Sequence, residues 1–180
     1  MFALLDAFLA SPRPAEPNRL LKGRVLVGTA FCAIVAMISI IAMQSALGVE
    51  GFLIEHLYFL SMSFGCLAIV RFTSQIEKAC SLMLFSILTY FTWGCYLSGG
   101  ISSYLVPGLL VFPLTSAMLA SHRQGGVWTA IGFGVLVFFG VVQPENTLNI
   151  DESSQHILDT LGFLLGAGAI GVLALIYESS

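Results

Sequence analysis

The sequence predicts an all-α integral membrane protein, built as a six-helix transmembrane bundle with both termini in the cytoplasm. Three observations lead to this class. Hydrophobic residues make up 57% of the chain and charged residues only 9%, whereas soluble domains carry about 25% charged residues. The apolar residues form six runs, each close to the roughly 17–25 residues that a helix needs to cross a bilayer. All seven Lys and Arg residues fall on one side of such a bundle.

Residues 1–23 precede the first run and form an amphipathic segment with a linker. Phe2, Leu5, Phe8 and Leu9 share one helical face, so we expect a short helix that lies on the membrane surface. The proline-rich stretch SPRPAEPN follows, and it cannot continue a helix because proline lacks the backbone donor.

The six apolar runs occupy residues 24–177, which we take as one transmembrane domain. Their approximate bounds are Val25–Gln44, Phe52–Val70, Ala79–Leu97, Ile101–Ala120, Gly126–Val142 and Ile157–Tyr177. Each is predicted to be a membrane-spanning helix. The fifth is the shortest and is rich in glycine.

The basic residues set the orientation. They precede the first run, separate the second from the third, or separate the fourth from the fifth: Arg13, Arg19, Lys22, Arg24, Arg71, Lys78 and Arg123. The loops at 45–51, 98–103 and 143–156 contain none. Because Lys and Arg are retained in the cytoplasm, these three loops are predicted to be external.

The external turn at Ser98–Ser103 is flanked by aromatic residues. Glycines 99 and 100 give the backbone the freedom to reverse. Trp93, Tyr96 and Tyr104 lie on both sides of the turn. Such rings are typical of the membrane interface, and they are also candidates for the wall of a ligand pocket.

Two ionisable residues, Glu55 and His56, enter the second run by about one turn. At this depth a charge costs less than at the bilayer centre. They are either an interfacial pair that contacts headgroups and water, or the polar wall of an outward-facing pocket. Both interpretations stay open from the sequence.

His156 and Asp159 lie at the outer start of the last run, three residues apart and on one helical face. His56 and His156 are predicted at similar depth on the same side. With the nearby carboxylates they are candidates for a ligand site, a metal site or a pH-responsive cluster. Their spacing matches no metal motif, so we expect no bound metal.

Prolines and small residues mark the helices that are candidates for movement. Pro113 lies in the middle of the fourth run and removes a backbone hydrogen bond there. Gly162 and Gly166 have the small-xxx-small spacing that allows close helix approach in lipid. That approach is either internal to the chain or to a second copy.

Several function classes find no support. The sequence contains no phosphate-binding glycine loop, no nucleophile elbow and no H-E-x-x-H motif. We therefore expect no enzyme activity from this chain, no catalytic residues, no cofactor and no nucleic-acid partner.

The stretch SGGISSY followed by PGLLVFP resembles a pattern in the six-helix N-terminal membrane regions of bacterial histidine kinases, diguanylate cyclases and adenylate cyclases. Gly99, Gly100, Ile101 and Ser103 match the pattern, and Tyr104 stands where proline is usual. The amphipathic start LLDAFLA is similar too, and the end LALIYESS resembles the exit of the sixth helix, so that residues 178–180 would begin a cytoplasmic signalling helix.

This resemblance implies a sensory or transducer domain in a bacterial inner membrane, with its cytoplasmic output domain missing from this chain. It also implies a parallel homodimer. A small, partly apolar ligand or a change of membrane state at the outer half would shift the sixth helix, and the exit at Tyr177 would pass that motion inward. Two alternatives stay open: a small six-helix transporter or channel, and a membrane enzyme or cofactor carrier built on His56 and His156.

Overall fold

The computed structural model describes residues 5, 8–9, 17–48, 53–73, 75–103, 105–120, 122–144, 156–160, 163–164, 167–168, 170–171 and 174–175. Its main elements are α2 (Pro17–Leu47), α3 (Leu53–Thr73), α4 (Ile76–Leu97), the 3-10 turn η1 (Gly100–Ser102), α5 (Val106–Leu119) and α6 (His122–Val141). No strand occurs among the described residues. The predicted all-helical class is confirmed for this part of the chain.

Four of these helices are long and apolar enough to cross a membrane. They cover Arg19–Leu47, Leu53–Thr73, Ile76–Leu97 and Arg123–Val141. Their outward faces are apolar as well, with Ile38, Phe64, Phe85 and Val137 among the exposed side chains. A water-soluble protein rarely exposes apolar surface on this scale, so the fold is that of a membrane protein.

The fourth predicted span differs from its helix. We predicted a span from Ile101, but α5 has 14 residues and begins at Val106. Its length is about 21 Å, less than the roughly 30 Å of the hydrocarbon core. The residues before it are used by the predicted reversal, where Gly99 and Gly100 have φ of 95° and 66°. The reversal itself is therefore confirmed.

The hydroxyl groups of Ser98 and Ser103 hydrogen-bond each other across this turn. The backbone N–H of Leu105 also donates to Ser103 Oγ, at 3.1 Å. Both serines are buried. These bonds satisfy polar groups that the reversal takes out of helical pairing, and they delay the start of α5.

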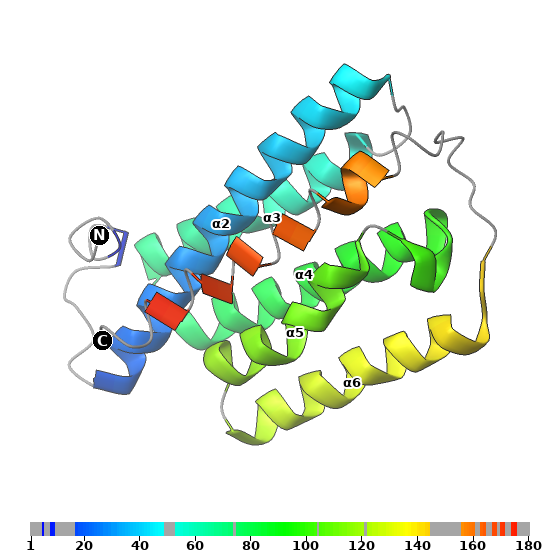
Figure 1. The fold of residues 1–180 in the computed structure, drawn as a ribbon. Coiled ribbons are helices and arrows are strands. Elements are labelled where there is room, and N and C mark those ends of the chain that lie inside the picture. Colours follow the sequence, from blue (N-terminus) through cyan, green and yellow to red (C-terminus); the bar gives the residue numbers. More distant parts are fainter. Residues whose placement is uncertain are drawn as a thin grey trace.

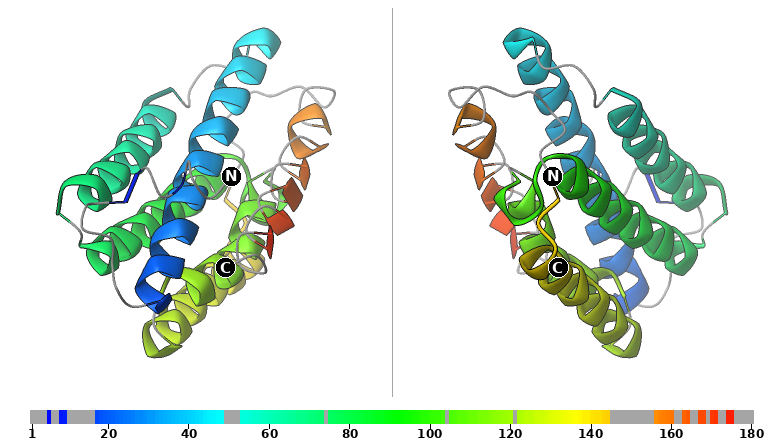
Figure 2. Two further views of the ribbon diagram at one scale, coloured as in Figure 1. Left: turned by 90° about the vertical axis from the view of Figure 1, so that its left-hand side faces the viewer. Right: turned by 90° about the vertical axis from the view of Figure 1, so that its right-hand side faces the viewer.

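The sixth predicted span is described only in parts. His156–Thr160 is helical, and so are the later residues that the structure describes up to 175. Leu158 is buried. Both views in Figure 2 place these residues, coloured orange to red, on the side of α2 opposite α3. Gly162, Gly166 and Tyr177, predicted to transmit a signal, lie outside the described residues.

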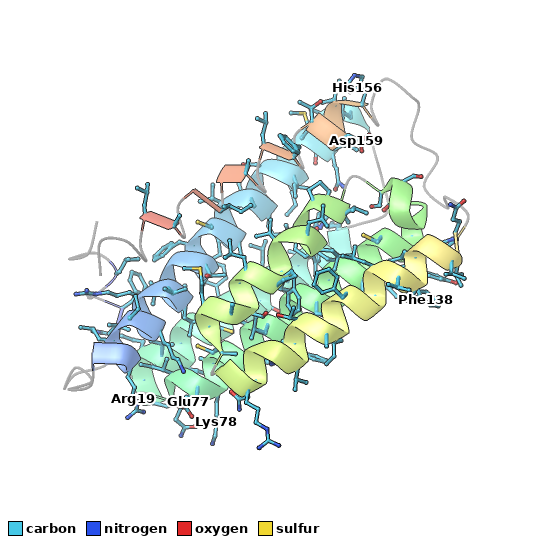
Figure 3. The ribbon with its side chains drawn as sticks, turned by 60° about the horizontal axis from the view of Figure 1, so that its bottom comes forward. Arg19, Glu77, Lys78, Phe138, His156 and Asp159 are labelled. Atoms are coloured by element: carbon cyan, nitrogen blue, oxygen red, sulfur yellow. The ribbon has the colours of Figure 1, made fainter. Side chains whose placement is uncertain are left out.

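Consecutive helices from α2 to α6 run in alternating directions (Figure 1). The start of α2, the end of α3, the start of α4 and the start of α6 therefore share one end of the bundle. Arg19 and Lys78 lie at this end, whereas His156 and Asp159 lie at the opposite end (Figure 3). The alternation predicted from the basic residues is thus present in the helices that the structure describes.

Helix α4 lies at the centre of the packing. It contacts α2, α3, α5 and α6. Close approach at α5 is possible because Gly108 has no side chain: a Cβ there would lie 2.1 Å from the Phe91 ring. Gly132 of α6 is similarly close to Phe112 of α5. Small residues thus bring neighbouring helices together, as is common in lipid.

The described residues of the N-terminal segment, Leu5, Phe8 and Leu9, pack on protein. Leu5 and Leu9 are buried in the apolar core. The Phe8 ring meets Phe31 of α2 edge-on, with centroids 5.0 Å apart, and Arg71 Nη1 donates to the Leu9 carbonyl at 3.2 Å. We predicted that this apolar face lies on the membrane surface, but its described side chains are covered by the helices.

Candidate functional site

Three buried polar side chains meet where α2 ends and α3 begins. His56 Nε2 lies 2.6 Å from Gln44 Oε1, and His56 Nδ1 lies 2.9 Å from the Tyr90 hydroxyl. All three side chains are buried, with exposed fractions of 5% for Gln44, 1% for His56 and 3% for Tyr90. We call these three residues the His56 cluster. It joins α2, α3 and α4 by side-chain hydrogen bonds.

Helical periodicity explains why His56 faces inward. On α3 the buried positions include His56, Phe59, Ser63, Cys66 and Val70, which recur every three or four residues along one face. The Tyr90 ring stacks on Phe59, with centroids 4.8 Å apart. The imidazole thus lies among apolar neighbours, where a buried polar group needs its hydrogen bonds.

The hydrogen bonds of the His56 cluster have defined donors. With the amide oxygen of Gln44 as acceptor, His56 Nε2 is the donor. On a neutral ring, Nδ1 then accepts from the Tyr90 hydroxyl. The cluster therefore fixes one tautomer of the ring and its rotation, and it holds three helices in one register at this end of the bundle.

Glu55 lies one residue before His56 and so points about 100° away around the helix. Its Oε1 accepts a hydrogen bond from Trp93 Nε1 of α4, at 3.3 Å. The Trp93 ring stacks in turn on Tyr96, with centroids 5.9 Å apart and an interplanar angle of 23°. We call Glu55, Trp93 and Tyr96 the aromatic–carboxylate patch. Both rings are exposed.

One atom of the patch is unsatisfied. Glu55 Oε2 is buried and has no hydrogen-bond partner among the described residues. Burying a charged oxygen without a partner costs more free energy than burying a neutral polar group. The carboxylate is therefore half-paired: one oxygen is held by Trp93, and the other is buried without a partner among the described residues.

His56 and His156, the two candidates for a site at the outer end, are not brought together in the structure. His56 is buried, with Gln44 and Tyr90 as partners, whereas His156 is exposed and Asp159 is partly exposed. The face of the 156–160 helix that packs inward carries Leu158 instead. Both histidines do lie at the same end of the bundle, as expected, but His156 belongs to its surface.

No metal centre is found in the part of the chain that the structure describes. None of its His, Cys, Asp and Glu residues form a group of three or more that would hold an ion. Three of the four cysteines are buried, and all four are free thiols.

Of the two remaining predicted residues, Tyr104 and Pro113, the structure describes only Pro113. Tyr104 lies outside the described residues. Pro113 lies inside α5, as expected. Its carbonyl accepts a hydrogen bond from Ser116 Oγ at 2.8 Å, and the same hydroxyl lies 2.8 Å from Thr129 Oγ1 of α6. Pro113 is therefore next to a polar contact between α5 and α6.

Sequence reasoning missed Gln44 and Tyr90 as site residues. Gln44 was only the boundary of the first predicted span, and Tyr90 was one aromatic residue among many. A signal was present for Gln44, because a polar amide at the end of a mostly apolar span needs a hydrogen-bond partner when it is buried. Gln44 also precedes His56 by a single short loop, which brings the two side chains to the same depth.

Comparison of the chain with protein-family models, with curated proteins and with solved structures finds no match. The geometry of the His56 cluster and of the aromatic–carboxylate patch is therefore the basis for assigning a function.

Proposed function

We propose that this chain is the membrane-embedded sensory or transducer region of a bacterial signalling receptor. In this proposal it lies in the inner membrane as a parallel homodimer, with both termini in the cytoplasm. It detects a small ligand or a membrane state at its outer half. The last predicted span, Ile157–Tyr177, carries the signal to a cytoplasmic output domain of the histidine kinase or nucleotide cyclase class.

The observation that carries this proposal is the position of the His56 cluster directly beside the aromatic–carboxylate patch. Glu55 and His56 are neighbours on α3, and Tyr90 and Trp93 are one turn apart on α4. A ligand that moves Trp93 or Glu55 would therefore act on the same two helix ends that the cluster holds together. The exposed aromatic–carboxylate patch is thus adjacent to the buried His56 cluster, whose hydrogen bonds join three helices.

The path from this end of the bundle runs through α4. That helix contacts both α5 and α6, and α5 carries Pro113 next to its polar contact with α6. A shift of α4 would change packing along this series of helices. Such a device signals only if the ligand binds one helix arrangement more tightly than the other.

A fusion protein tests the proposal. The chain would be joined, through a heptad helix after Ser180, to the dimeric catalytic core of a histidine kinase, and autophosphorylation would be measured in nanodiscs. Gln44→Leu removes a partner of His56 and should change kinase output several-fold. Phe85→Leu, which alters an exposed side chain on α4, should leave the output unchanged.

Equal output from the wild-type fusion and the folded Gln44→Leu fusion would contradict the sensory role. Substrate uptake into liposomes by the chain alone would also contradict the sensory role. If Gln44→Leu abolished that uptake, the chain would be a transporter. The fusion and the liposome assay use the same variants, so the two functions are separated directly.

A further inference from the structure

The aromatic–carboxylate patch has an unusual electrostatic feature. Glu55 Oε2 is buried without a hydrogen-bond partner among the described residues, while Oε1 is fixed by Trp93. The described Lys and Arg residues belong to the opposite end of the bundle, where Arg19 and Lys78 are seen in Figure 3. Among the described residues, no Lys or Arg therefore lies at this carboxylate's own end of the bundle to neutralise it.

Two aromatic faces lie next to this carboxylate. Trp93 is 50% exposed and Tyr96 is 46% exposed, and their rings are stacked with a tilt of only 23°. Trp and Tyr are common at the membrane interface because their amphipathic rings favour the headgroup level, even where no ligand binds. A hydrogen bond that ties one of them to a half-paired carboxylate is not explained by interface preference.

Carboxylate and aromatic groups together recognise a particular chemical class. An ammonium group is attracted to the negative face of an aromatic ring, most strongly to tryptophan, and aromatic cages bind quaternary ammonium ligands in this way. A carboxylate adds charge neutralisation. A divalent metal is a poorer match, because it needs several oxygen ligands and the described residues supply no such group.

We propose that Glu55, Trp93 and Tyr96 bind an organic ammonium group of the choline or ethanolamine type. The cation lies against the Trp93 and Tyr96 rings and neutralises the Glu55 carboxylate. The same chemistry is offered by a free small cation and by the headgroup of a zwitterionic lipid. Binding of the ammonium group does not depend on the proposed sensory role. Only the effect of that binding on signalling rests on the role proposed above.

Fluorescence of the full chain in nanodiscs measures the binding. The chain contains two Trp residues, so Trp128→Phe leaves Trp93 as the only indole. In nanodiscs of phosphatidylglycerol, which has no ammonium group, tetramethylammonium chloride should change Trp93 emission saturably. Sodium chloride at the same concentrations should not.

Two charge variants in the Trp128→Phe background make the titration specific. Glu55→Gln keeps an oxygen that accepts from Trp93 but removes the charge, and it should weaken tetramethylammonium binding at least about tenfold. Glu77→Gln removes an exposed carboxylate at the other end of the bundle and should leave the affinity unchanged. Tyr96→Leu should also weaken binding, because one aromatic face is lost.

The lipid arm identifies the source of the ammonium group. If a headgroup is the occupant, nanodiscs of phosphatidylcholine or phosphatidylethanolamine should show the shifted emission without added salt, and tetramethylammonium should add little. If a free cation is the occupant, only the titration should produce the shift. An unchanged emission in both arms, or equal responses from wild type and Glu55→Gln, would overturn the proposal. That result would leave the kinase-fusion test of the sensory role untouched.

Discussion

Removal of the Tyr90 hydroxyl is the sharpest test of the His56 cluster. In Tyr90→Phe the ring keeps its stack on Phe59, at a centroid distance of 4.8 Å, so packing is conserved. What is lost is the hydrogen bond to His56 Nδ1, 2.9 Å long. Because His56 and Tyr90 are 1% and 3% exposed, water cannot replace it.

The expected cost follows from that burial. Taking one partner from a buried polar pair costs about 1–3 kcal/mol. For a chain of this size, 1 kcal/mol corresponds to about 2–4 °C in melting temperature. We therefore expect Tyr90→Phe to lower the melting temperature by about 2–12 °C. In a His56→Leu background the same change should cost less, since the partner is already gone.

The buried cysteines provide the assay. Cys66, Cys80 and Cys95 are free and buried, so a thiol-reactive dye in detergent reports unfolding as they become exposed. Tyr96→Phe is the matched control, because it removes a hydroxyl from an exposed ring on the same helix. A shift of less than about 1 °C for Tyr90→Phe, or equal shifts for both variants, would refute the reasoning.

Two further predictions concern packing and use the same assay. Gly108→Ala should destabilise the bundle by about 1–3 kcal/mol, because its Cβ would lie 2.1 Å from the Phe91 ring, whereas Gly134→Ala should be tolerated, since nothing lies within 4 Å. Leu9→Ala should cost about 2–5 kcal/mol because Leu9 is 3% exposed. Leu110→Ala, at an exposed position, should cost far less, and equal losses would mean that Leu9 does not pack on the helices.

Hydropathy predicted most of the helices because a helix in lipid must satisfy its own backbone and present apolar side chains. It did not predict where α5 begins. The residues from Ser98 to Ser103 are paired within a turn by hydroxyl and backbone bonds. A count of apolar residues cannot detect these bonds.

The His56 cluster was harder to foresee for a physical reason. In a membrane helix both the buried and the lipid-facing sides are apolar, so the sequence pattern does not fix the rotation of the helix. On α3, Phe59 is 2% exposed and Phe64 is 57% exposed, although the two residues are chemically identical. Which polar residues meet across helices therefore depends on packing, and Gln44 and Tyr90 became visible as partners only in three dimensions.

The sensory proposal requires the aromatic–carboxylate patch to lie outside the cell. Cysteine labelling with a membrane-impermeant maleimide tests this most directly, because Ser102 and Gln75 are both exposed and lie at opposite ends of α4. On intact cells, Ser102→Cys should be labelled, and Gln75→Cys should be labelled only after the membrane is permeabilised. Labelling of Gln75→Cys with protection of Ser102→Cys would place the patch in the cytoplasm and contradict the proposal.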